Sequence, residues 1–149
     1  MSSSVRERSR IQEKSVAKDL KGRVTVASGA KWFQKSDVLT EKYRVECKTT
    51  SKDRYVISSD VWEKIKDEAL SSGLIPLLVV DLSDRERYVV FEQSDFFEDV
   101  YEEGTKHFQY TFRGCSDFLI VTLKHRRAYM RDHNLMAMPI AEFKEMEED

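Results

Sequence analysis

Apolar and polar residues alternate along the segment from Tyr43 to Lys48. Successive side chains of a β-strand point to opposite faces. One face is therefore predicted to carry the apolar side chains and the other the charged ones, Arg44, Glu46 and Lys48. Glu46 and Lys48 are thus expected to be neighbours on one surface of a strand, with Tyr43, Val45 and Cys47 turned toward a core.

A short segment over 36–39 precedes this strand, and the two together predict a β-hairpin. If the loop between them has two residues, Val38 pairs with Val45 and Asp37 lies opposite Glu46. Facing carboxylates destabilise a sheet unless a cation lies between them. Mg²⁺ is commonly held by one or two carboxylates together with substrate phosphate. The hairpin is therefore a candidate metal site, although Glu-x-Lys alone is also typical of a solvated sheet face.

The segment from about Ser9 to Lys21 has the periodicity of an amphipathic helix, with Gly22 as its predicted C-cap. Its apolar stripe, expected to turn toward the sheet, consists of Val16, Ala17 and Leu20. Glu13 falls on the same stripe, whereas Asp19 lies off it and is expected to face solvent or phosphate. Glu13 either joins an acidic cluster or, at the edge of the stripe near the helix start, interacts favourably with the helix dipole.

The middle of the chain continues an α/β pattern. Ser58-Ser59-Asp60 is predicted to cap a helix that runs to about Ser72 and stops at Gly73. Its expected buried residues are Val61, Ile65, Ala69 and Leu70, with Trp62 as a further candidate. The continuously apolar segment 74–80 is typical of a central strand covered on both faces, and a further strand is predicted over 87–91.

Beyond Gln93 the pattern predicts a helix over 94–103, strands over 107–113 and 117–123, and an acidic, disordered tail over 142–149. A second basic cluster follows the last of these strands: Lys124, His125, Arg126, Arg127, Arg131 and His133. Such a run either contacts DNA or forms a solvated face.

The spacing of the histidines does not match a metal site. The sequence therefore predicts neither a zinc-binding nor a general-base role for His107, His125 or His133.

Four segments together resemble a known nuclease family: Glu13–Leu20, Ala27–Ala30, Ser36–Val38 and Val45–Thr50. In order and spacing they are similar to the PD-(D/E)XK nuclease superfamily, and within it to archaeal Holliday-junction resolvases and their phage-encoded relatives. The likeness spans roughly Glu13 to Leu82, with serine at position 36 in place of the proline of the superfamily's name.

The resemblance implies an α/β fold with an αβββαβ core, in which helices flank a mixed central sheet. The expected organisation is a single nuclease domain over 1–149, with its core at about 9–92, a C-terminal α/β extension at about 93–141, and the acidic tail.

The same resemblance implies roles for individual residues. Asp37 and Glu46 would bind Mg²⁺, for which Mn²⁺ would substitute, together with the backbone carbonyl of Cys47. Lys48 would orient or activate the attacking water, and Glu13 would complete the acidic cluster, directly or through water. The residues expected to contact DNA are Arg10, Lys14, Ser28, Gly29, Lys31, Lys35 and Lys52, together with Arg126 and Arg127.

Charge is distributed unevenly along the chain. Residues 1–60 hold 14 Lys+Arg and 8 Asp+Glu, whereas residues 61–149 hold 11 and 19, so that a basic half and an acidic half underlie the net charge of −2. Local positive potential attracts a phosphate backbone even when the whole chain is acidic. The basic half carries the candidate site, although an ordinary solvated mixture of charges produces the same asymmetry.

Composition restricts the remaining possibilities. A chain of 149 residues is long enough for one sizeable core and too short for two ordinary domains. The two cysteines are far apart and form no CxxC pair, which argues against a disulfide framework. The absence of a signal-peptide pattern or a long apolar run predicts a cytoplasmic protein that does not contact a membrane.

The expected function is therefore a metal-dependent, structure-selective DNA endonuclease that resolves four-way or branched DNA as a homodimer. One alternative is a restriction- or repair-type nuclease on duplex, nicked or single-stranded DNA. The other is a catalytically silent DNA-binding module of the same fold.

Overall fold

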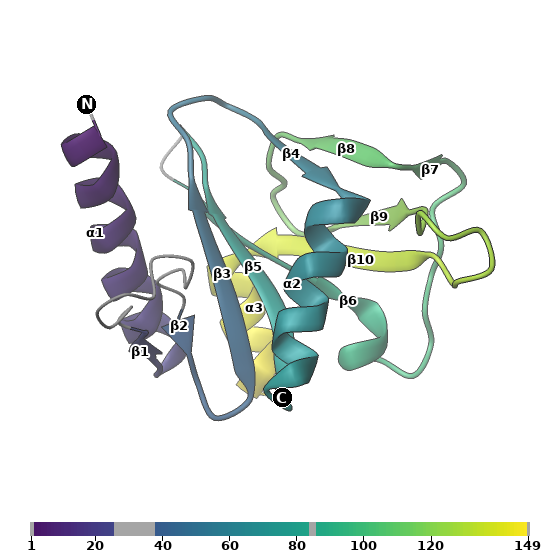
Figure 1. Ribbon diagram of the computed structural model, residues 1–149, viewed down its shortest axis with the longest axis horizontal. Coiled ribbons are helices and arrows are strands. Elements are labelled where there is room, and N and C mark those ends of the chain that lie inside the picture. Colours follow the sequence, from purple (N-terminus) through teal and green to yellow (C-terminus); the bar gives the residue numbers. More distant parts are fainter. Residues whose placement is uncertain (1, 26–37, 84–85, 149) are drawn as a thin grey trace.

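The computed structural model describes residues 2–25, 38–83 and 86–148, with side chains from residue 7 onward (Figure 1). The elements in chain order are α1 (Ser2–Leu20), β1 (Arg23–Val24), β2 (Val38–Leu39), β3 (Tyr43–Thr49), β4 (Tyr55–Ser58), α2 (Ser59–Ser71), β5 (Ile75–Asp81), β6 (Arg87–Glu92), the 3₁₀ helix η1 (Gln93–Asp95), β7 (Lys106–His107), β8 (Gln109–Phe112), β9 (Leu119–Leu123), β10 (His133–Pro139) and α3 (Ile140–Glu148).

The described strands form a mixed sheet in the order β1-β2-β3-β5-β6-β10-β9-β7, and β4 pairs with β8 in a separate small sheet. β3 and β5 are parallel, connected through β4 and α2, whereas β5 and β6 are antiparallel neighbours. The predicted α/β class with a mixed central sheet is confirmed. The C-terminal strands β10, β9 and β7 continue this sheet beyond β6.

Two apolar cores cover the two faces of the sheet. One contains α1 and α3, with Val16, Leu20 and Phe143 packed against the sheet. The other contains α2 and the β4–β8 pair, with Trp62 and Phe112 at its centre. Figure 1 shows α2 and α3 on opposite sides of the sheet, and α1 beside its β1–β2 edge. β5 is buried from both sides, as its apolar sequence predicted.

The hairpin of β2 and β3 has the predicted register, because Val38 pairs with Val45. The Thr40 N–H donates to the Tyr43 carbonyl at 2.9 Å, and the Thr40 hydroxyl accepts hydrogen bonds from the N–H groups of Lys42 and Tyr43 at 3.1 and 2.8 Å. A threonine side chain thus closes a turn that lacks the usual Asn-Gly or Asp-Gly signal.

The end of α1 differs from the prediction. Lys21, with φ of 58°, takes the left-handed position that usually favours glycine, and the Gly22 N–H donates to the Ala17 carbonyl at 2.8 Å. Gly22 has another role, because a Cβ there would lie 2.6 Å from the Leu39 carbonyl oxygen. The glycine is needed for the close approach of this segment to β2.

α2 begins as predicted, because the Ser58 hydroxyl accepts a hydrogen bond from the Val61 N–H at 3.2 Å. Its buried face, however, is Ser59, Trp62, Ile65 and Ala69. Val61 is 36% exposed and Leu70 57% exposed, whereas Trp62 is fully buried. The prediction that Val61 and Leu70 are buried is wrong, because the sheet is contacted through Trp62.

The predicted helix over 94–103 is also wrong, since only η1 forms there. The buried Gln93 side chain instead holds an irregular segment: its amide nitrogen donates to the carbonyls of Tyr101 and Leu135, and its oxygen accepts from the Tyr101 N–H. The predicted strand over 107–113 is split into β7 and β8, which belong to different sheets.

The acidic C-terminal segment is helical, contrary to the predicted disordered tail. α3 buries Phe143 completely against Tyr43, Phe91 and Phe96, and Met146 packs against the same core. Packing of an apolar residue at nearly every turn therefore makes this segment helical despite its acidic composition. Of the helices that the structure describes, none combines the length and the apolar character needed to cross a membrane.

Candidate functional site

The charged residues of β3 share one face, as the alternation predicted, and this face is covered by α2. Glu46 is only 7% exposed, and its Oε1 lies 3.5 Å from the Nζ of Lys48. Arg44, on the same face, lies 3.9 Å from Glu68 of α2. The opposite side chains, from Tyr43, Val45 and Cys47, pack into the core shared with α1.

A small pocket of about 140 Å³ opens beside Glu46. Its lining comes from β3, β4 and α2: Glu46, Lys48, Tyr55, Val61, Lys64, Ile65 and Glu68. Burial and, secondly, the negative charge of Glu46 raise the pKa of Tyr55. The Tyr55 hydroxyl therefore stays neutral at physiological pH beside this carboxylate. The pocket joins two carboxylates, two lysines and one phenol within reach of solvent.

α1 contacts this strand through a residue that the sequence pattern did not single out. The amide nitrogen of Gln12, which is almost fully buried, donates to the Lys48 carbonyl at 2.6 Å. Gln12 precedes Val16 and Leu20 at helical spacing, so extending the apolar stripe by one turn would have found it. The bond fixes the backbone of Lys48 against α1.

Arg87 of β6 also holds α1 in place. Its guanidinium makes two hydrogen bonds to Asp81, at 2.8 and 2.9 Å, and further ones to Ser15 at 2.8 Å and Asp19 at 3.1 Å. Hydrogen bonding to Asp81 raises the pKa of Arg87, which is charged in any case. Asp19 is thus part of an ion-pair network, although 31% of its side chain is exposed, so the prediction that it faces solvent is correct only in part.

Of the other predicted catalytic residues, the structure describes Glu13 but not Asp37. Glu13 is half-buried on α1, next to Gln12, and does not line the pocket beside Glu46. Asp37 lies outside the described residues, although the adjacent Val38 has the predicted partner. The roles of Glu13, Asp37 and the Cys47 carbonyl therefore stay predictions.

The predicted DNA-contacting residues fall into separate groups. Arg10 and Lys14 are exposed on α1, and Lys52 is exposed in the loop after β3. The loop between β9 and β10, with the exposed Arg126 and Arg127, lies at the opposite end of the molecule from α1 (Figure 1). Ser28, Gly29, Lys31 and Lys35 lie outside the described residues.

Arg126 is already paired. Its Nε contacts Asp60 near the start of α2 at 2.5 Å, and its backbone N–H donates to Glu63 at 3.4 Å. The β9–β10 loop is therefore anchored to α2, and its basic cluster is distinct from the basic surface of α1.

No family model matches the chain, and no curated protein matches it significantly.

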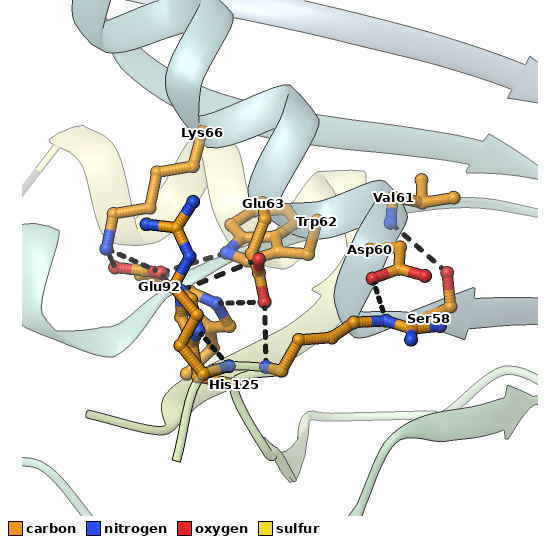
Figure 2. Close-up of polar contacts among 11 residues, drawn as sticks. Ser58, Asp60, Val61, Trp62, Glu63, Lys66, Glu92 and His125 are labelled. Atoms are coloured by element: carbon orange, nitrogen blue, oxygen red, sulfur yellow. Dashed lines mark hydrogen bonds and ion pairs between the residues drawn. The ribbon is translucent and has the colours of Figure 1, made fainter. Parts of the chain in front are cut away.

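A second group of potential metal ligands lies on the other side of α2 from Glu46. Glu63 projects toward His125 (Figure 2). His133, at the start of β10, offers a ligand atom within 4.8 Å of those of both residues. His125 Nε2 lies 3.5 Å from Glu63 Oε1, and His133 Nε2 lies 3.6 Å from Glu63 Oε2. All three ligand atoms lie within 4.8 Å of one another, so this group could hold a metal ion.

Histidine spacing in the sequence did not reveal this arrangement. Glu63, His125 and His133 come from α2, the β9–β10 loop and β10, and only the fold brings them together. The basic cluster that contains the two histidines was recognised in the sequence. Its acidic partner 62 residues before His125 was not, because nothing local connects them.

Glu92 supports this second group through its contact with His133. It is 5% exposed and accepts hydrogen bonds from Trp62 Nε1 at 2.9 Å, from Lys66 Nζ at 3.0 and 2.9 Å, and from His133 Nδ1 at 2.9 Å (Figure 2). Burial by itself would raise the pKa of Glu92, but the bonds from His133, Trp62 and Lys66 outweigh it and lower the pKa to about 2. Glu92 is therefore a buried, ionised carboxylate that accepts a hydrogen bond from each of these three neighbours.

Proposed function

We propose that the protein is a metal-dependent DNA endonuclease of the PD-(D/E)XK type, acting on branched DNA such as four-way junctions. The observation that carries this proposal is the β2–β3 register, with Val38 opposite Val45 and with Glu46 and Lys48 on one face, 3.5 Å apart. Asp37 directly precedes Val38 in the sequence but lies outside the described residues, so its position opposite Glu46 is part of the proposal.

The chemistry assigned to each residue follows from its charge. Glu46 and Asp37 supply the carboxylate oxygens that Mg²⁺ prefers. The bound ion would polarise the scissile phosphate and lower the pKa of a bound water. Lys48 provides a fixed positive charge beside Glu46, where negative charge develops on the attacked phosphate. Gln12, bonded to the Lys48 carbonyl, is a positioning residue that holds this lysine in register.

The substrate proposal rests on charge and symmetry. Arg10, Lys14 and Lys52 are exposed in the basic half of the chain and would neutralise phosphates without reading bases. A four-way junction has two equivalent strands to cut, and each chain offers one set of these residues. Symmetric resolution therefore requires a homodimer with two-fold symmetry.

Cleavage assays with matched substrates test the proposal. Wild-type protein with Mg²⁺ is expected to cut a four-way junction and to prefer it over linear duplex of the same arm sequence. Glu46→Gln should abolish cleavage while junction binding in EDTA stays equal or becomes tighter. Lys48→Ala should slow cleavage by about 10²- to 10³-fold. Glu41→Gln, in the exposed β2–β3 turn, is the control and should cut like wild type.

Other outcomes lead to different conclusions. Wild-type turnover by Glu46→Gln would refute the assigned site. Equal cutting of junction and duplex by a monomer in light scattering would favour a repair-type nuclease. Tight junction binding without cleavage under any divalent metal would favour a DNA-binding module.

A further inference from the structure

The ligand atoms of Glu63, His125 and His133 have the spacing of a small transition-metal site. Zinc bonds to nitrogen and oxygen are about 2.0–2.1 Å long, and a tetrahedron of such bonds places its ligand atoms about 3.3–3.4 Å apart. The observed separations are 3.5 Å from His125 Nε2 to Glu63 Oε1 and 3.6 Å from His133 Nε2 to the other oxygen, Oε2, and the three ligand atoms lie within 4.8 Å of one another. The three side chains would therefore have to draw together to bind a single ion at zinc distances.

His133 provides an independent reason to expect a cation here. Its side chain is 5% exposed, and Nε2 makes no hydrogen bond within the described structure, although it is aimed at Glu63. A neutral His133 that donates from Nδ1 to Glu92 has a lone pair on Nε2. A buried lone pair facing a carboxylate is unfavourable, and either a proton on Nε2 or a metal ion between the two groups would relieve it.

The hydrogen bond from His133 to Glu92 is also the support that histidine ligands usually have. Metal-bound histidines commonly donate their second N–H to a carboxylate, which fixes the tautomer and the ring orientation. Glu92 is itself held by Trp62 and Lys66. The outer-shell support of the His133 ligand is therefore already in place.

We propose that Glu63, His125 and His133 form a Zn²⁺-binding site that is separate from the proposed nuclease site. Two imidazoles and one carboxylate suit zinc and other late transition ions, whereas Mg²⁺ prefers an all-oxygen set. α2 separates the two sites, because Val61, Lys64, Ile65 and Glu68 line the pocket at Glu46 while Glu63 projects toward β10. The fourth coordination position, next to the partly exposed Glu63, would be open to water.

Zinc binding also has a consequence for the β9–β10 loop. The Arg127 N–H donates to His125 Nδ1 at 3.0 Å, so a neutral His125 carries its proton on Nε2. Coordination through Nε2 requires the proton on Nδ1 instead, and the Arg127 contact must then be given up. The loop around His125 is therefore expected to rearrange, and to be tied to α2 and β10 once zinc is bound.

Zinc binding by the full-length protein tests the inference. Protein stripped with chelator should bind one Zn²⁺ per chain in calorimetry, and Co²⁺ should give the intense visible bands of a low-coordinate site with nitrogen ligands. Glu63→Gln and His125→Ala should each weaken zinc binding at least tenfold, and Glu92→Gln about 10- to 100-fold. His107→Ala is the matched control, since His107 Nε2 also lies 3.5 Å from a glutamate, Glu103, outside the proposed site.

Circular dichroism of every variant without metal shows whether it folds, and zinc should raise the Tm of wild type but not of Glu63→Gln. Glu46→Gln must keep wild-type zinc affinity, so the result does not depend on nuclease activity. The inference is overturned if stripped wild type binds no stoichiometric Zn²⁺, which would leave a protonated His133 between two carboxylates. It is equally overturned if Glu63→Gln binds zinc as tightly as His107→Ala.

Discussion

Truncating Trp62 should destabilise the protein far more than truncating its neighbour Val61. Trp62 is completely buried in the core beneath α2, and its Nε1 donates to the ionised Glu92 at 2.9 Å. Val61 is 36% exposed at the rim of the pocket beside Glu46. The two substitutions therefore test which face of α2 meets the sheet.

The expected magnitudes follow from these contacts. Trp62→Ala should lower the free energy of unfolding by about 3–5 kcal/mol, because it leaves a large cavity and removes a hydrogen-bond donor. Trp62→Phe keeps most of the ring and should cost about 1.5–3 kcal/mol, the contribution of a hydrogen bond to a charged group. Val61→Ala should cost less than about 1 kcal/mol, since much of its side chain stays in contact with water.

Urea unfolding followed by far-ultraviolet circular dichroism measures all three variants, and avoids tryptophan fluorescence, which the substitution itself changes. A typical domain has about 5–15 kcal/mol of stability, so even Trp62→Ala is expected to leave a measurable folded baseline. If Val61→Ala is as damaging as Trp62→Ala, then α2 is rotated toward the face that the sequence pattern predicted. The reasoning would then be refuted, and the positions of Glu63 and Lys66 with it.

Two further predictions concern Glu92 and Glu13. The metal-free protein should lose stability as pH falls from about 5 toward 2: the folded pKa of Glu92, about 2, lies below its ordinary 4.5, so the stabilisation is present above the unfolded pKa and disappears on protonation. At 1.36 kcal/mol per pKa unit, the stabilisation lost on protonation of Glu92 amounts to about 3 kcal/mol. If the stability of a Glu92→Gln variant changed with pH as much as that of wild type in acid titrations, the prediction would be contradicted. If Glu13 belongs to the proposed nuclease site, Glu13→Gln should strongly slow junction cleavage with little change in Tm. Glu7→Gln, exposed on the same helix, should cut normally. The reverse pattern would show that α1 turns another face toward the site.

Local features of the sequence were sufficient to predict the β2–β3 hairpin. Alternation over β3 placed Glu46 and Lys48 on one face because strand geometry has a period of two, and the short turn fixed the pairing of Val38 with Val45. The cap at Ser58 was predictable for the same reason, since the hydroxyl acts on an N–H three residues away. Such effects depend on residues that are neighbours in the chain.

Other features depend on packing between distant segments. The pattern of α2 allowed either Val61 or Trp62 to face the sheet, and Glu92, 30 residues later, supplies the partner for the Trp62 N–H. The composition of α3 predicted a charged tail. In the structure, Phe143 of α3 packs against an aromatic cluster formed by β3, β6 and the segment after η1.

The group of Glu63, His125 and His133, on the far side of α2 from Glu46, is the clearest case of this kind. Glu63 and His133 are 70 positions apart, and no short spacing connects them. Pairing of β10 with both β6 and β9 puts His133 beside Glu92 and Glu63. Periodicity in the sequence determines which face a side chain occupies, but only the tertiary arrangement of the strands decides which distant side chains share that face.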